Sequence, residues 1–351
     1  MKYGKTYSDI ARFKKSFISD NKKLVEENNR ISDIYRKQPH REECKVCSSG
    51  NYSSGEYFCL NKIKYYVCPD CGHINGEFLE TEDFTNSVYV DGDFGNFYKE
   101  DQVELYKERM HAIYTPKAKF MTSTLENICG EDWRSFAYLD VGAGSGYYVA
   151  ALLELGLDAR GIEISPQQVS FGNAMHKKLL STVGGDKCFC LGEDEVVARI
   201  RKAKEAVISF FGVWEHVINL HEILDAINQN DNIRYVYFSV PVFCFSIFLA
   251  AVNEDVFCRS LGGAHTHIFT EKSLNYIYDK YKWEIVDQWN FGADIPDLYR
   301  ILKVKLEQQN NNFLSRIIDE KIFPLIDKMQ LCIDESGMCS EVHVIIKNHK
   351  Q

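Results

Sequence analysis

Residues 136–164, FAYLDVGAGSGYYVAALLELGLDARGIEI, decide the fold that this sequence predicts. The apolar run 136–141 is typical of a buried parallel strand, and it leads directly into a glycine-rich turn at 142–146. Apolar residues then recur with helical spacing as far as Gly156, and a second strand is expected at 159–164. A strand, glycine-rich turn, helix and strand in this order form a unit that binds a nucleoside at the carboxyl ends of its strands.

The spacing inside this stretch favours one kind of nucleoside ligand. Tyr147 occupies the place where the dinucleotide fingerprint G-x-G-x-x-G has its third glycine. Asp140, just before the turn, would repel a pyrophosphate, but it suits a ligand with a cationic amino-acid tail. Glu163, at the tip of the second strand, is placed to accept hydrogen bonds from both ribose hydroxyls.

With these residues the stretch resembles motif I of the S-adenosylmethionine (SAM)-dependent methyltransferases with a Rossmann-like fold. Two later segments, Glu215-His216-Val217 and HTHIFTEKSL at 265–274, resemble a broad group of bacterial small-molecule methyltransferases. The resemblance covers about residues 98–290. It implies SAM as cofactor, and the cofactor-binding residues that it implies are Asp140, Gly142, Ala143, Gly144, Gly146, Glu163, Ile164, Asp194 and Phe211.

Strands alternate with helices after residue 136, which predicts a largely parallel sheet. Together with the resemblance, this pattern predicts an α/β fold: a Rossmann-like, seven-stranded, mostly parallel sheet sandwiched by helices and preceded by a small zinc ribbon. A third strand is expected around 182–191 and is poorly marked in the sequence. Residues 301–331 are expected to be mostly helical, ahead of a last strand at 342–346.

Two cysteine pairs precede this unit, Cys44-x-x-Cys47 and Cys68-Pro-Asp-Cys71. Each pair can hold a metal ion as a knuckle, and two knuckles complete a tetrahedral shell of four thiolates. The residues between the pairs are typical of the strands of a zinc ribbon. Because a closed shell of four thiolates has no open position for water, the predicted zinc is structural.

The composition limits the classes of partner. The chain has 351 residues, of which 45% are hydrophobic, so it can bury a substantial core. Its net charge of −9 makes a general nucleic-acid-binding surface an unfavourable interpretation. The longest apolar candidate, 240–252, is too short to span a membrane, and the N-terminus lacks the apolar centre of a signal peptide. Twelve cysteines without such a signal predict a cytoplasmic protein.

Four consecutive segments are expected along the chain. They are a basic helical segment at 1–41, a zinc-ribbon module at 42–76, a linker with lid helices at 77–130 and a SAM-binding methyltransferase domain at 131–351. The first segment carries eleven Lys and Arg residues against five acidic ones, which favours a solvated helix packed on the main domain or on a partner. An arm that binds RNA or a phosphorylated substrate is the alternative. In the third segment the resemblance suggests Tyr98, Arg109 and Tyr114 as pocket residues.

Three histidines are candidates for the chemistry. Methyl transfer mainly requires alignment of the reacting atoms, but an alcohol or carbon acid also needs a base. His216 follows the strand that forms one wall of the SAM pocket, whereas His265 and His267 belong to a segment expected to close over the substrate. The alternatives are that His216 caps or packs the next helix, and that the other two are merely solvated.

The sequence therefore predicts an enzyme that methylates a small polar acceptor. A nucleotide-linked sugar, or a precursor of a surface polysaccharide or secondary metabolite, is the favoured acceptor. One alternative is an RNA methyltransferase that uses the ribbon and the basic arm, although the base-methylating signature Asn/Asp-Pro-Pro-Tyr/Phe is absent at 211–214. Another is a catalytically inactive SAM-binding or scaffold protein; the intact Asp140, Glu163 and glycines argue against lost cofactor binding, but not against lost turnover.

Overall fold

The computed structural model of the chain describes residues 1–7, 11–14, 16–85, 87–88, 102–180, 184–257 and 259–348. The chain forms two compact units, each assembled from separate stretches of sequence. The first unit consists of Met1–Val90, Val240–Ile277 and Trp289–Val342; the second consists of Asp91–Ser239, Tyr278–Gln288 and His343–Gln351. This division differs from the four consecutive segments expected from the sequence, because each unit collects segments that are distant along the chain.

The larger sheet is mostly parallel, as predicted. Its eight strands have the order β1-β11-β12-β9-β8-β5-β6-β7. Their bounds are β1 Lys2–Tyr3, β5 Ala137–Val141, β6 Asp158–Glu163, β7 Cys188–Cys190, β8 Val207–Phe211, β9 Tyr235–Pro241, β11 Glu284–Phe291 and β12 Glu341–Lys347. Strand β5 pairs in parallel with both β6 and β8, and the pairs β6–β7 and β8–β9 are parallel as well.

The described residues contribute one strand more than the seven predicted. Strand β1 has only two residues and pairs in parallel with Trp289 and Asn290 of β11. Two residues carry no periodic pattern, so the sequence gives no sign of this strand. Strand β7 is also shorter than the expected 182–191, of which 182 and 183 lie outside the described residues.

Buried strands explain the continuous apolar runs in the sequence. Residues 207–210 of β8 and 235–240 of β9 are all buried. Strands of a parallel sheet are covered by helices on both faces, so the side chains on both faces are apolar. In β5 the exception is Asp140, a buried carboxylic acid just before the glycine turn. A buried acid in an otherwise apolar strand marks this end of the sheet as a site of chemistry.

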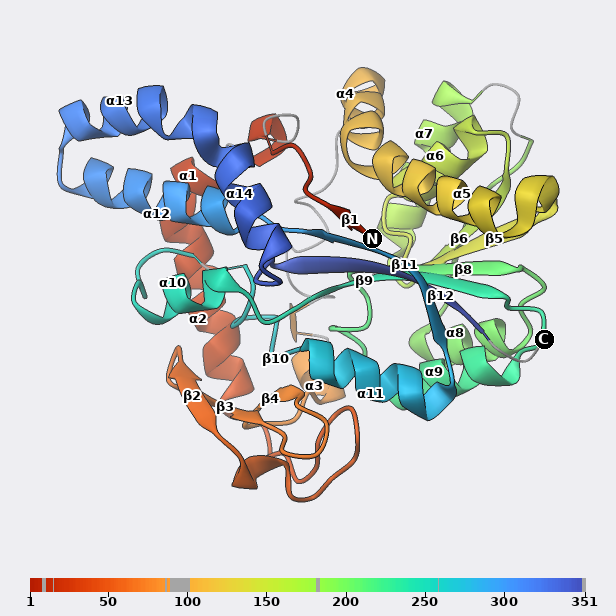
Figure 1. Cartoon of the computed structure of the whole chain (residues 1–351), viewed down its shortest axis with the longest axis horizontal. Coiled ribbons are helices and arrows are strands. Elements are labelled where there is room, and N and C mark those ends of the chain that lie inside the picture. The colour runs from red at the N-terminus through yellow and green to blue at the C-terminus, as the bar shows by residue number, and fades with distance from the viewer. Residues whose placement is uncertain are drawn as a thin grey trace. The chain divides into compact units, whose positions relative to one another are not determined.

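Helices of the second unit cover both faces of its part of the sheet. Helices α5, α6 and α7 lie on one face, whereas α8 and α9 lie on the other (Figure 1). The bounds are α4 Val103–Arg109, a π-helix η5 Met110–Tyr114, α5 Thr115–Cys129, η6 Gly130–Ser135, α6 Tyr147–Glu154, α7 Pro166–Leu179, α8 Glu193–Arg201 and α9 Leu220–Gln229. Helix α7 begins as predicted, because the Ser165 hydroxyl accepts from the Gln168 N–H and Pro166 is the first helical residue.

The first unit contains a small antiparallel sheet, with the strand order β10-β4-β3-β2. Its strands are β2 Tyr57–Leu60, β3 Ile63–Val67, β4 Ile74–Gly76 and β10 His267–Ile268. Strand β10 was not predicted: His267 pairs with Asn75, and Ile268 pairs with Ile74. A segment that follows the cysteine pairs by about 190 residues therefore completes the sheet that they accompany.

The remaining helices are mostly in the first unit. They are η1 Ala11–Lys14, α1 Ser16–Ser19, α2 Asn21–Tyr35, η2 Tyr52–Ser54, α3 Glu82–Thr85, α10 Phe245–Ala251, α12 Asp294–Gln308, α13 Asn312–Lys321, η7 Phe323–Leu325 and α14 Ile326–Glu335; α11 Glu271–Tyr281 has residues in both units. Helices α12 to α14 confirm the predicted helical region, and β12 follows them as expected. No helix in the described ranges is long and apolar enough to cross a membrane.

Candidate functional site

The turn between β5 and α6 requires glycine. The φ angles are 71° at Gly142, 53° at Gly144 and 73° at Gly146, all in the left-handed region. Space is short as well: a Cβ at Gly142 would lie 2.5 Å from Cγ2 of Val213, and one at Gly146 would lie 2.8 Å from the ring of His176. The alternating glycines of the sequence therefore describe a turn that no other residues form without strain.

Glu163 holds this turn in place. Its Oε2 accepts a hydrogen bond from the Gly144 N–H at 2.9 Å, and its Oε1 accepts from the N–H groups of Ile164 at 2.9 Å and Ser165 at 3.0 Å. The residue is only 9% exposed. A carboxylate has about four acceptor positions, so one on Oε2 is left for a ligand. The sequence indicates a ribose acceptor here, but not this second role as a clamp on the turn.

Asp140 is a buried acid beside the same turn. Its Oδ1 accepts a hydrogen bond from the Ser209 hydroxyl at 2.6 Å, and the side chain is 3% exposed. Burial raises the pKa of the Asp140 carboxyl to about 7, although the Ser209 hydrogen bond and the positive charge of Lys117 act to lower it. A cationic group placed beside Asp140 would favour the ionised carboxylate.

The carboxyl ends of β5 and β8 define the place where a ligand can enter. These neighbouring strands lie where the strand order reverses direction, with β6 on one side and β9 on the other. Ligands of open α/β sheets bind in the crevice outside such a switch point. Phe211, the last residue of β8, packs its ring edge-on against Tyr148 at 4.6 Å and Tyr237 at 4.8 Å. This packing fixes one aromatic wall beside the glycine turn.

The segment after β8 is anchored by Trp214. This side chain is fully buried and stacks on Phe238, with 4.0 Å between the ring centroids. The preceding Val213 packs against Gly142, which brings this segment to the glycine turn. Glu215 is buried and His216 is half-buried. The anchored indole therefore sets the position of His216 near the carboxyl end of β8.

The other predicted cofactor residues are also in the second unit. Ala143 donates its N–H to the Ile162 carbonyl at 3.0 Å, so it contributes to the turn through its backbone. Ile164 has a 43% exposed side chain next to Glu163. Asp194 is exposed in the first turn of α8. The structure thus brings Asp140, the glycine turn and Glu163 together, whereas Asp194 makes no contact with them that defines its role.

An aromatic stack covers the start of α6, and most of it was missed from the sequence. Tyr147 lies between Tyr106, at a ring distance of 4.1 Å, and Tyr114, at 5.2 Å. The Tyr106 hydroxyl donates to the Ser145 carbonyl at 2.8 Å, which ties α4 to the glycine turn. Arg109 lies 5.6 Å from the Tyr147 ring. Arg109 and Tyr114 were pocket candidates; the third candidate, Tyr98, lies outside the described residues.

The π-helix η5 accounts for the position of these side chains. Its five residues, Met110–Tyr114, separate α4 from α5. A π-helical turn shifts the side chains that follow it around the helix axis, and such turns often occur at functional sites. Beyond the turn, the ammonium of Lys117 lies 4.7 Å from the Phe211 ring, and this side chain is 7% exposed. No periodic pattern in the sequence predicts a π-helix. For this reason Lys117 was not among the candidate pocket residues.

The three predicted catalytic histidines belong to different units. His216 is in the second unit, whereas His265 and His267 are in the first. His265 lies in a tight turn, where its backbone exchanges hydrogen bonds with Gly262, and burial lowers the pKa of its imidazole. His267 is fully buried in β10, and its Nδ1 is 2.9 Å from Nε2 of His73. This pairing favours a structural role for His267.

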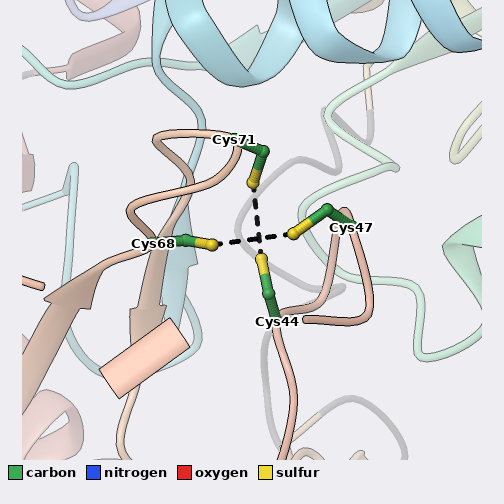
Figure 2. A group of neighbouring side chains, drawn as sticks. All are labelled: Cys44, Cys47, Cys68 and Cys71. Atoms are coloured by element: carbon green, nitrogen blue, oxygen red, sulfur yellow. Dashed lines mark hydrogen bonds between the residues drawn. The ribbon is translucent and has the colours of Figure 1, made fainter. Parts of the chain in front are cut away.

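The four predicted metal ligands form a compact cluster in the first unit. Figure 2 shows the sulfur atoms of Cys44, Cys47, Cys68 and Cys71 pointing toward one centre. The Sγ atoms are 3.5 Å apart between Cys44 and Cys71, and 3.6 Å apart between Cys47 and Cys68. Four sulfurs at 2.3 Å from a tetrahedral zinc are about 3.8 Å from one another, so the cluster has the dimensions of such a site. It is a Cys₄ cluster compatible with zinc.

A family model described as a methyltransferase domain matches residues 107–288, which is more than half of the chain. The chain therefore belongs to this family of methyltransferase domains. The match begins in α4 and includes the glycine turn, Asp140, Glu163 and the segment with His216.

Several solved structures resemble this one. Magnesium protoporphyrin IX methyltransferase from Synechocystis PCC 6803, with bound SAH, gives a TM-score of 0.46 at 11% identity, covering 76% of this chain and 96% of that one. A putative sarcosine dimethylglycine methyltransferase from Galdieria sulphuraria gives a TM-score of 0.42 at 11% sequence identity. The match covers 75% of this chain and 98% of that one. Geranyl diphosphate C-methyltransferase from Streptomyces coelicolor A3(2) gives a TM-score of 0.41 at 12% sequence identity. The match covers 72% of this chain and 86% of that one. No curated protein sequence matches this chain.

Replacing Glu163 by Ala should weaken both the turn and the cofactor site. Three backbone N–H groups lose their acceptor, so the melting temperature should fall. SAM affinity should drop roughly ten- to a hundredfold, or about 1.5–3 kcal/mol, measured by calorimetry. The melting temperature and SAM affinity of Glu163→Gln should lie between those of the parent protein and of Glu163→Ala, since the Gln amide keeps one acceptor oxygen. The exposed Glu126→Ala is the matched control. Unchanged SAM affinity in Glu163→Ala would exclude Glu163 as a cofactor ligand.

Asp140 should link SAM binding to a proton. Its pKa of about 7 leaves about half of the carboxyl protonated at pH 7, and a cationic ligand should expel that proton. Calorimetry in two buffers of different ionisation enthalpy should show release of about half a proton per SAM at pH 7. Asp140→Asn should abolish the release.

The same carboxyl makes the stability of the ligand-free protein depend on pH. The folded state keeps the Asp140 proton to about pH 7, whereas an ordinary Asp carboxyl has a pKa of 3.8. The contribution of Asp140 is therefore greatest below about pH 4 and is lost as the pH rises through about 7. In the calorimetric experiment described above, the heat of SAM binding could be equal in the two buffers. This result would show that Asp140 does not face the cationic part of the ligand.

Proposed function

We propose that this methyltransferase acts on a small polar acceptor, with a nucleotide-linked sugar or a precursor of a surface polysaccharide or secondary metabolite as the acceptor class. The observation that supports SAM-dependent methyl transfer is the glycine turn flanked by Asp140 and Glu163, next to the anchored segment with His216. The net charge of −9 supports a small acceptor over a polyanion such as RNA.

The residues around the turn fit SAM in shape and charge. When bound, SAM supplies a methyl group on a sulfonium centre. Asp140 would face the cationic amino-acid tail, and the open acceptor position on Glu163 would receive a ribose hydroxyl. The positive φ angles of the turn let its backbone approach the ligand closely, since no Cβ intervenes.

His216 is the proposed general base in the second unit. Methyl transfer to a hydroxyl requires removal of the acceptor proton, and a neutral imidazole is suited to this near pH 7. Trp214 holds the segment rigidly, which keeps the imidazole at the carboxyl end of β8.

Labelled SAM and a panel of sugar nucleotides test the acceptor class and the base together. We expect methyl transfer to at least one member of the panel and none to a short RNA. His216→Asn should lower kcat about 10²–10⁴-fold with little change in SAM affinity. His111→Asn, a partly exposed histidine paired with Glu154 in the same unit, serves as control. Transfer to RNA alone, or full activity of His216→Asn, would contradict this assignment.

We also propose that the Cys₄ cluster holds one structural zinc ion. The supporting observations are the dimensions of the cluster and the burial of Cys44, Cys68 and Cys71. The hydrogen bond from Cys71 lowers the pKa of the Cys44 thiol to about 5. A divalent cation would stabilise the thiolate form of all four ligands, and four thiolates leave no open coordination position.

Removal of zinc should affect the first unit and spare SAM binding. Elemental analysis should give one zinc per chain, and Cys68→Ser should lose it. The small sheet should then unfold, because zinc binding supplies folding energy. SAM should still bind, since all nine predicted cofactor residues belong to the second unit. Cys332→Ser, at an exposed cysteine outside the cluster, should keep the metal. A zinc content that is unchanged in Cys68→Ser would refute the assignment.

A further inference from the structure

A polar side chain is completely buried beside the Cys₄ cluster of the first unit. Asn75 is the central residue of β4, and its exposed fraction is 0%. Asparagine is depleted in strands and is seldom buried without partners, so its presence here calls for hydrogen bonds within the protein. The neighbouring Ile74 belongs to a hydrophobic core cluster of the same unit. Because successive side chains of a strand point to opposite faces, Asn75 points away from that core.

The side-chain amide of Asn75 is hydrogen-bonded at both ends. Its Oδ1 accepts from the Lys45 N–H at 2.9 Å. Its Nδ2 donates to Cys44 Sγ at 3.4 Å and to the His73 carbonyl at 3.2 Å. Both N–H bonds and the oxygen of the amide therefore have partners, and one of these partners is a predicted metal ligand.

The two backbone partners determine which end of the amide faces the sulfur. The Lys45 N–H is a donor and the His73 carbonyl is an acceptor, so the first meets the oxygen of Asn75 and the second meets its nitrogen. The reversed amide would place like groups together at both contacts, and it would direct its oxygen at the Cys44 sulfur. The end that faces the cluster is therefore the N–H donor.

The position of Asn75 joins the two cysteine pairs. Cys44 and Lys45 belong to the first pair, whereas His73 lies two residues after the second pair. The backbone of Asn75 is held from both sides, because β4 lies between β3 and β10 in the small sheet. A donor fixed in this way is already in place before a metal ion binds, so binding does not have to order it.

We propose that Asn75 is a positioning residue of the metal centre, which orients the Cys44 thiolate toward the ion and disperses its charge. Four thiolates around one divalent ion leave an excess of negative charge in a mostly buried site. A hydrogen bond to a charged acceptor is stronger than one between neutral groups, and a low local dielectric strengthens it further. The inference rests on the proposed structural zinc, and it adds the residue that holds one of the zinc ligands.

Competition for zinc with a chromophoric chelator, in mildly alkaline buffer, tests this role on the full chain. Asn75→Ala should bind zinc about ten- to a hundredfold more weakly, because the Cys44 thiolate loses its donor. Asn75→Asp keeps the size of the side chain and the acceptor for the Lys45 N–H, but it sets a carboxylate oxygen against the thiolate. It should therefore weaken zinc binding at least as much as Asn75→Ala.

Asn51→Ala is the matched control, because it removes an exposed asparagine of the same module and should leave zinc affinity unchanged. Circular dichroism at saturating zinc verifies that the variants fold. If Asn75→Asp binds zinc as tightly as the parent protein, the side chain only fills space and accepts from Lys45, and the proposal is overturned.

Cadmium NMR gives a second measurement, which needs no variant to fold. With the NMR-active isotope of cadmium in place of zinc, a side-chain amide proton of Asn75 should show a scalar coupling to the metal through the N–H···S hydrogen bond. A cadmium-loaded parent protein without this coupling overturns the proposal.

Metal content separates this inference from the proposed zinc site. If the parent protein holds one zinc ion and both Asn75 variants bind it with unchanged affinity, the role of Asn75 is refuted while the zinc site stands. If the parent protein holds no zinc, the zinc site and the role of Asn75 are refuted together.

Discussion

The glycine turn after β5 depends on the hydrogen bonds that three backbone N–H groups donate to the carboxylate of Glu163. Glu163 ends β6, and its oxygens receive hydrogen bonds from the turn after β5 and from the start of the chain beyond β6. Charge-assisted bonds of this kind are stronger than neutral ones, and a buried carboxylate without them would be costly. One side chain thus joins two neighbouring strand ends and still offers an acceptor to a ligand.

The same region uses two acids for different purposes. Glu163 is satisfied by backbone donors, whereas Asp140 has Ser209 as its hydrogen-bond donor and is deeply buried. Burial therefore raises the pKa of Asp140 to about 7, which makes its charge responsive to a cationic ligand. An acid that keeps a proton when the site is empty avoids the cost of an unpaired buried charge.

The sequence was most informative where structure is local. The strand, the glycine turn and the following helix are adjacent in the chain, and their spacing predicts β5, α6 and β6 and the positions of Asp140 and Glu163 near the strand ends. It was uninformative where structure depends on distant pairing. Strands β1 and β10 have two residues each, and their partners are far away in the sequence. The clamp formed by Glu163 and the stack on Tyr147 likewise depend on contacts between elements, which no single-strand or single-helix pattern encodes.

The cysteine cluster organises more of the chain than the segment that contains it. Thr270 donates its hydroxyl to the Gly72 carbonyl, and Thr266 donates to Glu80. Glu80 is buried, which raises its pKa, but Lys45 at 3.6 Å and Arg41 at 2.5 Å lower that pKa to about 2. Because removing these charges from water offsets their attraction, the ion pair is weak evidence for added stability.

Strand β10 and the His73–His267 pair reinforce these bonds. The segment 265–270, whose sequence resembles a segment of bacterial small-molecule methyltransferases, is thereby fixed to the residues around Cys68 and Cys71. A structural metal at the cluster would then stabilise more than its own ligands, because β10, which carries His267, pairs with β4 a few residues after Cys71.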